Sequence, residues 1–168
     1  MGIRLFFCAV IFLSSSFIGL EFRRRMFIRL RGLNYFRQYF RSVRAYVSHV
    51  GMSLDDIAYE LEGRNNDFAF CDILREKNQF VNFSSAFADT LNVMQKSFCF
   101  TDDDCASLCS FVSKIGSSDI DGALEVLDLA DEQLAEWIYS AKEKCETEGK
   151  ICIVLGLSCG AVVALLFL

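Results

Sequence analysis

The chain has 168 residues, of which 53% are hydrophobic and none is proline, so the composition favours long uninterrupted helices. The net charge of −5 is unevenly distributed: nine arginines oppose one acid up to residue 45, and eight basic residues oppose twenty-one acids after it. Because the arginine block lies beside an apolar stretch and the rest of the chain is acidic, nucleic acid is not the expected partner. Anionic lipid headgroups are an alternative partner for these arginines.

Two apolar stretches bound the chain. Residues 5–20 and 151–168, sixteen and eighteen in number, contain no charged side chain. Flanking residues bring each stretch close to the roughly 20 residues that span a bilayer core of about 30 Å. Basic residues follow the first stretch and precede the second, which is typical of flanks that stay in the cytoplasm. We therefore expect a transmembrane helix over 1–22, a cytoplasmic helical bundle over 23–149 and a C-terminal transmembrane helix over 150–168.

The first apolar stretch has a second interpretation. Arg4, an apolar run and then three serines at 14–16 are also typical of a cleaved secretory signal peptide. Three arginines at 23–25 follow at once and the helical pattern continues past them, which favours a retained span. Whether the first span is retained or cleaved stays open at this point.

Apolar residues recur at helical spacing through the middle of the chain. A stripe from Met26 to Val47 continues the first apolar stretch as one long helix, and the pattern from Ile120 to Lys150 runs on into the second stretch. Between them, residues that commonly cap helices mark the starts of four shorter helices. The expected starts are Ser53, Asn66 or Asp67, Ser84 or Ser85, and Thr101. Because no useful run alternates with period two, the sequence predicts an all-α fold, a six-helix bundle whose first and last helices continue into transmembrane spans.

Seventeen phenylalanines supply much of the apolar volume. At helical spacing they most simply fill a core, and an exposed aromatic patch for docking is the alternative. Phe80, Phe83 and Phe100 lie at or near predicted helix junctions, so exposure is expected for them more than for the residues of the helical stripes.

The sequence contains no recognisable catalytic or metal-binding motif. Its eight cysteines include no CxxC pair, and the single histidine, His49, falls in a predicted turn. The patterns of zinc proteases, serine hydrolases and phosphate-binding loops are absent. The three acids after Thr101 are explained by helix capping. We therefore expect no enzyme, no cofactor and no metal site.

Two sets of residues are candidates for contacts between helices. Gly156, Gly160 and Ala164 form a small-xxx-small repeat, which allows membrane helices to pack closely or to self-associate, although Gly and Ala are also common in spans. If the two long helices are antiparallel neighbours, residues equidistant from the membrane boundaries at Phe22 and Lys150 should meet. The expected pairs are Arg29 with Glu143, Arg41 with Asp131, and Arg44 with Asp128. The alternative is that these acids face solvent or bind a partner such as an ATPase.

The second half of the chain carries a more specific pattern. A helix ends in Ile115-Gly116, a Ser-Ser-Asp turn follows, and a long charged helix leads to Leu155-Gly156 and Gly160. Together with the arginine-rich first helix, this pattern resembles the stage III sporulation protein AB family of endospore-forming bacteria over essentially the whole chain. Ala123 and Met52-Ser53 depart from the residues common in that family, which leaves the details of two turns open.

The resemblance implies a cytoplasmic domain similar to the six-helix domains of platform proteins in type II secretion and type IV pilus systems. It also implies a position in the mother-cell membrane around the forespore. There the protein would join other membrane proteins and a secretion-type cytoplasmic ATPase in a secretion-like complex. The implied role is assembly and coupling, and a membrane-tethered helical adaptor with a single soluble partner is the alternative.

Overall fold

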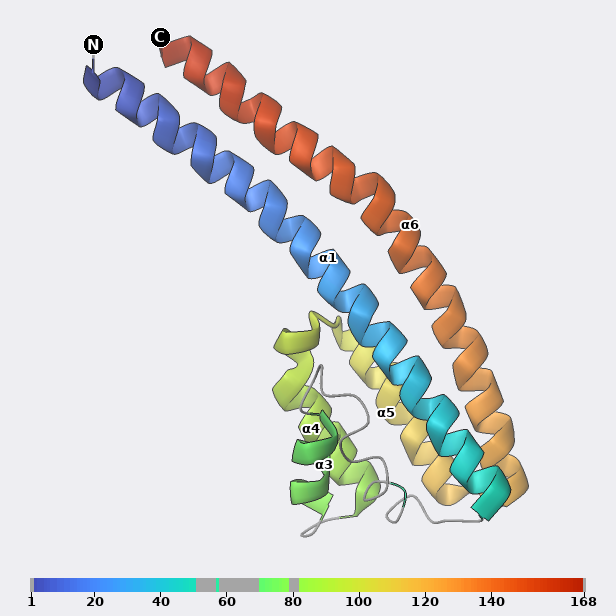
Figure 1. The fold of residues 1–168 in the computed structure, drawn as a ribbon. Helices are drawn as coiled ribbons and strands as arrows, with labels where there is room; N and C mark the ends of the chain where they lie inside the picture. The colour runs from blue at the N-terminus through green and yellow to red at the C-terminus, as the bar shows by residue number, and fades with distance from the viewer. Residues whose placement is uncertain (1, 51–56, 58–69, 79–81, 168) are drawn as a thin grey trace. The chain divides into compact units, whose positions relative to one another are not determined.

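The structure, a computed structural model, describes residues 2–50, 57, 70–78 and 82–167, and every regular element in these ranges is a helix. Labelled as in Figure 1, the helices are α1 (Gly2–Val50), α3 (Phe70–Asn78), α4 (Phe83–Phe98), α5 (Asp102–Ser117) and α6 (Ile120–Phe167). The predicted all-α class is confirmed over the described ranges. The helix predicted from Ser53 lies outside them except for Ile57, which is helical and buried. The count of six helices therefore stays a prediction.

The chain divides into two compact units. Unit 1 combines residues 1–30 with residues 138–168, and unit 2 comprises residues 31–137. The two long helices α1 and α6 contribute to both units, as the sequence predicts for helices that run without interruption. Unit 2 falls inside the range 23–149 that the sequence assigns to the bundle.

In unit 1, α1 and α6 lie side by side (Figure 1). Gly149 of α6 is buried, and a Cβ added to it would lie 3.4 Å from Cγ of Arg23 in α1. Among the residues that the structure describes, no helix contains a segment long and apolar enough to cross a membrane. Many side chains of the predicted spans over 1–22 and 150–168 lie outside the described residues, and these spans are not confirmed.

Unit 2 is built around buried aromatic side chains. Phe36 of α1 is fully buried, and its ring centroid lies 4.9 Å from that of Phe70 in α3, 6.0 Å from Phe87 and 5.4 Å from Phe98 in α4. The three pairs meet edge to face, an arrangement that aromatic quadrupoles favour. One aromatic cluster thus joins α1, α3 and α4, which confirms for these residues that phenylalanines fill a core.

Two phenylalanines at helix ends are buried, contrary to the prediction. Phe83 is 7% exposed and Phe100 is 6% exposed, so the exposure predicted for them is wrong. The ring of Phe100 stacks on that of Phe98, with centroids 5.1 Å and planes 13° apart. Cys99 between them adopts a left-handed conformation with φ 54°, which turns the chain back at the end of α4. Phe80 lies outside the described residues.

The helix starts follow from side-chain caps. The Thr101 hydroxyl accepts the backbone N–H of Asp104 at 3.2 Å, and the Asp104 carboxylate accepts the backbone N–H of Thr101 at 3.0 Å. This reciprocal capping box confirms the predicted start of α5. The predicted helix start near Ser84 or Ser85 is confirmed too, because α4 begins at Phe83, one residue before Ser84, where the Asn82 side chain accepts the N–H of Ser85 at 2.9 Å and caps the helix. The caps predicted at Asn66 or Asp67 lie outside the described residues.

Candidate functional site

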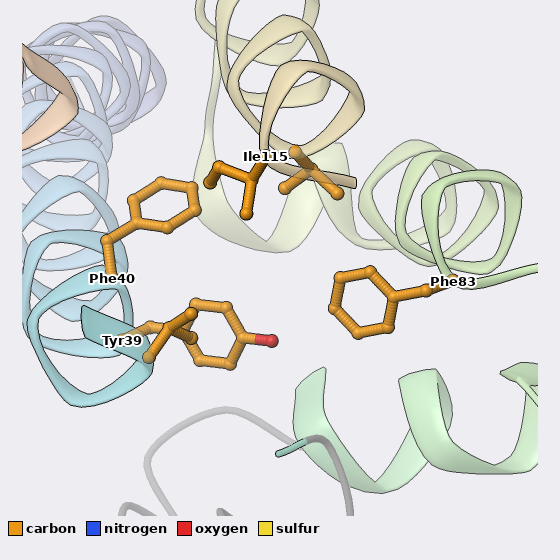
Figure 2. A pocket seen from close by; sticks show the side chains of 6 residues that line it. Tyr39, Phe40, Phe83 and Ile115 are labelled. Carbon is orange, nitrogen blue, oxygen red and sulfur yellow. The ribbon is translucent and has the colours of Figure 1, made fainter. Parts of the chain in front are cut away.

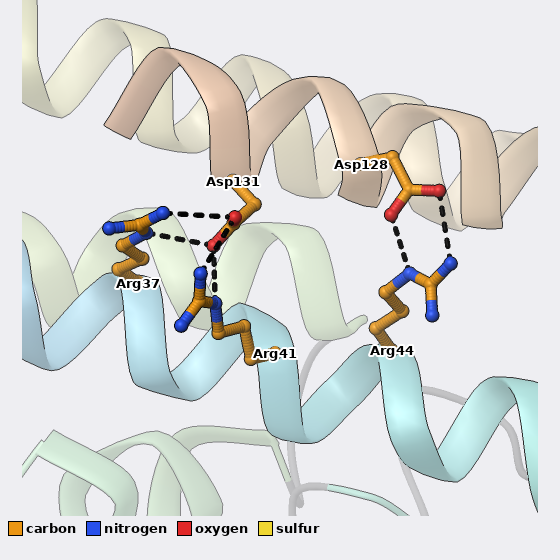
Figure 3. Close-up of polar contacts among 5 residues, drawn as sticks. All are labelled: Arg37, Arg41, Arg44, Asp128 and Asp131. Atoms are coloured by element: carbon orange, nitrogen blue, oxygen red, sulfur yellow. Dashed lines mark hydrogen bonds and ion pairs between the residues drawn. The ribbon is translucent and has the colours of Figure 1, made fainter. Parts of the chain in front are cut away.

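Five charged side chains of α1 and α6 form a cluster in unit 2 (Figure 3), which we call the arginine–aspartate ladder: Arg37, Arg41, Arg44, Asp128 and Asp131. Asp131 accepts hydrogen bonds from Nε and Nη2 of Arg37 at 2.9 and 3.1 Å and from the same atoms of Arg41 at 2.6 and 3.0 Å. Asp128 accepts them from Arg44 at 2.5 and 3.1 Å. Each guanidinium therefore binds its carboxylate through two parallel N–H groups, which makes the pairing directional.

The arginines determine the ionisation of the two acids. Hydrogen bonds from Arg41 and Arg37 hold the pKa of Asp131 well below its usual range, and the hydrogen bond from Arg44 lowers the pKa of Asp128. The side chains of Arg37 and Asp131 are each 27% exposed, whereas those of Arg44 and Asp128 are 45% and 59% exposed. Because water screens exposed pairs, the shared carboxylate of Asp131 is the stronger part of the ladder.

The ladder has the register expected from the sequence. The structure brings Arg41 to Asp131 and Arg44 to Asp128, so α1 and α6 are antiparallel neighbours within unit 2. Arg37 is a ladder residue that the register argument missed, because that argument gives each acid one partner. The signal was present in the sequence: Arg37 and Arg41 are four residues apart and share one face of the helix.

The remaining predicted contacts fall in unit 1. Arg29 lies on α1 and Glu143 on α6, and their pairing stays a prediction. Gly156, Gly160 and Ala164 are helical positions of α6 whose side-chain surroundings lie outside the described part of the structure. The small-residue contact therefore also stays a prediction.

A small cavity lies beside the aromatic core of unit 2 (Figure 2). Its volume is about 10 Å³, roughly the room for one water molecule. The hydroxyl of Tyr39 is buried and has no hydrogen-bond partner among the described residues, and burial raises the pKa of this phenol. The other lining side chains are apolar: Phe40, Val43, Phe83, Val112 and Ile115. A cavity of this size with an apolar surface has the character of core packing rather than of a ligand site.

The thiols of α5 are not activated. Burial raises the pKa of Cys105 to about 11 and also raises the pKa of Cys109. Since the thiolate is the nucleophile and the metal ligand, these neutral thiols are poorly suited to either role. Within the described ranges, no three Cys, His, Asp or Glu side chains are grouped so that they could hold a metal ion.

In unit 1 the surface changes from apolar to charged on both helices. On α1, the arginines at 23–25 follow five large apolar side chains that are each more than half exposed: Leu13, Phe17, Ile18, Leu20 and Phe22. On α6, Lys150 is exposed, and at least half-exposed apolar side chains follow at Ile151, Val154 and Val162. Because Arg23 of α1 lies against Gly149 of α6, the change from apolar to charged surface occurs at the same height along the two neighbouring helices of unit 1.

The comparison with known families is specific and covers nearly the whole chain. Residues 4–168 match the family described as stage III sporulation protein AB. That family is a structural family of sporulation and is not known as an enzyme family. Neither a curated protein nor a solved structure matches the chain.

Proposed function

Because this chain belongs to the stage III sporulation protein AB family, we propose that it is a membrane-anchored platform component of the secretion-like complex that links mother cell and forespore. A role in sporulation follows from the family itself. In the proposed role, the protein assembles with other membrane proteins of the complex and couples them to a secretion-type cytoplasmic ATPase. It acts by binding and positioning, without chemistry of its own.

The observation that carries membrane attachment is the paired change of surface character in unit 1. Apolar surface exposed to water costs about 25 cal/mol per Å², and hydrocarbon removes that cost. On α1 the run of more than half-exposed apolar side chains reaches Phe22, next to Arg23, and on α6 a further set begins at Ile151, next to Lys150. Cations directly beside an apolar segment favour a cytoplasmic flank. On this proposal, residues 1–22 and 150–168 lie in the mother-cell membrane and 23–149 in the cytoplasm.

Unit 2 supports a binding role through the acids that the ladder leaves unused. The ladder holds α1 and α6 together through Asp128 and Asp131, while further acids of α6 are exposed: Asp121, Glu125, Glu132 and Glu136. Such a face suits a partner with a basic surface, which the platform role assigns to the ATPase. The same face favours the second candidate function, a membrane-tethered adaptor with one soluble partner.

Within the membrane, Gly156, Gly160 and Ala164 would let α6 pack closely against another membrane helix or against a second copy of the chain. Replacing Gly160 with Ile adds a branched side chain at that surface. The expected result is loss of the detergent-resistant assembly, seen as a smaller species in size-exclusion chromatography. An unchanged assembly would exclude the small-residue contact.

The platform role is tested by deleting the gene in its host and following sporulation by membrane-stain microscopy and counts of heat-resistant spores. Forespores that complete engulfment and then stall or shrink support the platform, and normal spores overturn it. Purification of the full chain separates the two candidates, because a platform brings down several membrane proteins and the ATPase, whereas an adaptor brings down one soluble protein.

The docking face is tested by charge removal. The double variant Glu132→Gln with Glu136→Gln is expected to lose the ATPase from the purified complex. Asp103→Asn is the matched control, because Asp103 is an exposed acid on α5 and lies off this face. Equal recovery of the ATPase from both proteins would show that the exposed acids of α6 do not bind it.

A further inference from the structure

The side chain of Arg23 has an unusual environment at the boundary of unit 1. Its guanidinium carbon lies 5.3 Å from the centroid of the Phe27 ring, and its stem lies against the backbone of α6 at Gly149. Its Nε is buried and has no hydrogen-bond partner among the described residues. This buried Nε and the ring of Phe27 fix the guanidinium in place, so an external anion would meet the Nη groups of Arg23.

Further cations lie next to Arg23 in the sequence and on the neighbouring helix. The side chains of Arg24 and Arg25 are 73% and 67% exposed, and each forms an ion pair with the Glu21 carboxylate, at 3.8 and 3.4 Å. Lys150 directly follows Gly149 and is exposed. Within residues 21–25 and 148–150, these four cations stand against two acids, Glu21 and the exposed Glu148, so the boundary carries an excess of positive charge.

We propose that three of these cations, which we call the collar, bind the phosphate of an anionic phospholipid headgroup: Arg23, Arg24 and Lys150. The proposal rests on the membrane attachment proposed above. A guanidinium binds phosphate through paired N–H groups, and Arg23 is already held by Phe27 and Gly149, so little side-chain freedom is lost on binding. The adjoining exposed apolar side chains of Phe22 and Ile151 suit acyl chains, which favours a lipid over free phosphate.

The test measures lipid retained by the full chain. Purified protein in mild detergent is mixed with phosphatidylglycerol or with phosphatidylcholine, and native mass spectrometry counts the bound lipids. The intact chain is expected to retain phosphatidylglycerol in preference. Arg23→Gln is expected to retain it about fivefold more weakly, which corresponds to about 1 kcal/mol for one charge at a membrane surface.

Two variants serve as comparisons. Arg31→Gln removes the same charge from an exposed position of α1 outside the collar and should leave retention unchanged. Arg23→Lys keeps the charge but removes the guanidinium, and it should recover only part of the binding. The fluorescence of Trp137 shows whether Arg23→Gln changes the urea midpoint of unfolding. If it does, Arg24→Gln replaces it as the test variant, so that a loss of stability is not mistaken for a loss of lipid binding.

Several outcomes overturn the proposal. Equal retention of the two lipids by the intact chain excludes a headgroup site, and so does an equal effect of Arg23→Gln and Arg31→Gln. Displacement of phosphatidylglycerol by an equal concentration of inorganic phosphate would assign the site to a free anion. Alkaline carbonate extraction of host membranes separates the two proposals: a chain that is washed off overturns membrane attachment as well, whereas a retained chain without lipid preference overturns only the headgroup site.

Discussion

Gly32 is the position where the packing of unit 2 leaves no room for a side chain. A Cβ added to this buried glycine of α1 would lie 2.9 Å from Cε1 and 3.0 Å from Cζ of Phe100, and 3.0 Å from Cδ1 of Phe98. Neither ring can move freely, because Phe98 is fully buried, Phe100 is 6% exposed and the two are stacked. Gly32→Ala therefore forces the aromatic cluster apart, at a cost of about 1–3 kcal/mol for an overpacked core.

Helix propensity opposes that cost. Alanine in a helix interior is favoured over glycine by about 1 kcal/mol, so we expect Gly32→Ala to lower the free energy of unfolding by a net amount of up to about 2 kcal/mol. The assay is urea unfolding of the full chain in mild detergent, followed by the fluorescence of Trp137. This is the only tryptophan, and its ring centroid lies 6.3 Å from that of Phe111 within unit 2.

Gly149→Ala is the matched control for Gly32→Ala. It makes the same change in a helix interior, but its added Cβ would meet only the flexible stem of Arg23, at 3.4 and 3.9 Å. We expect the control to be neutral or slightly stabilising, because the propensity gain remains and the stem can shift. A urea midpoint for Gly32→Ala equal to or above that of the unchanged protein would refute the packing argument.

Three further predictions concern the polar groups of unit 2. Asp131→Asn should lower the urea midpoint more than Asp128→Asn, because Asp131 accepts hydrogen bonds from two arginines. The pKa of Asp131 is lower in the folded state than the usual value of about 4, so its contribution to the free energy of unfolding is complete above that pH and is lost as the pH falls further. The Asp131→Asn variant should therefore lose less stability in acid than the unchanged protein. Tyr39→Phe should be neutral or stabilising in the same assay, because it removes a buried hydroxyl without a partner while keeping the ring, and a clear loss of stability would reveal an acceptor for that hydroxyl. Thr101→Ala should cost about 1 kcal/mol through loss of the α5 cap, whereas Thr101→Ser should retain most of that stability; equal midpoints for all three proteins would contradict the capping role.

The ladder shows how far charge patterning alone could go. An antiparallel register counted from Phe22 and Lys150, the ends of the two apolar stretches expected from the sequence, leads to Arg41 with Asp131 and to Arg44 with Asp128, and both contacts form in unit 2. The register could not indicate that Asp131 is shared, because sharing depends on the rotation of α1 about its axis and on how far Arg37 reaches. Nor could it assign any of these residues to a partner, because an acid that is exposed and an acid that is paired look alike in a sequence.

The sequence by itself determined the helical class, the two long uninterrupted helices and the start of α5 at Thr101. These features depend on residues within about one helical turn of each other, through periodicity, the absence of proline and the capping box. Only the tertiary structure decided that Phe83 and Phe100 are buried and that Gly32 must lack a side chain. Their surroundings come from helices distant in the sequence, and Phe100 is buried because the left-handed turn at Cys99 directs it back onto Phe98, next to α1.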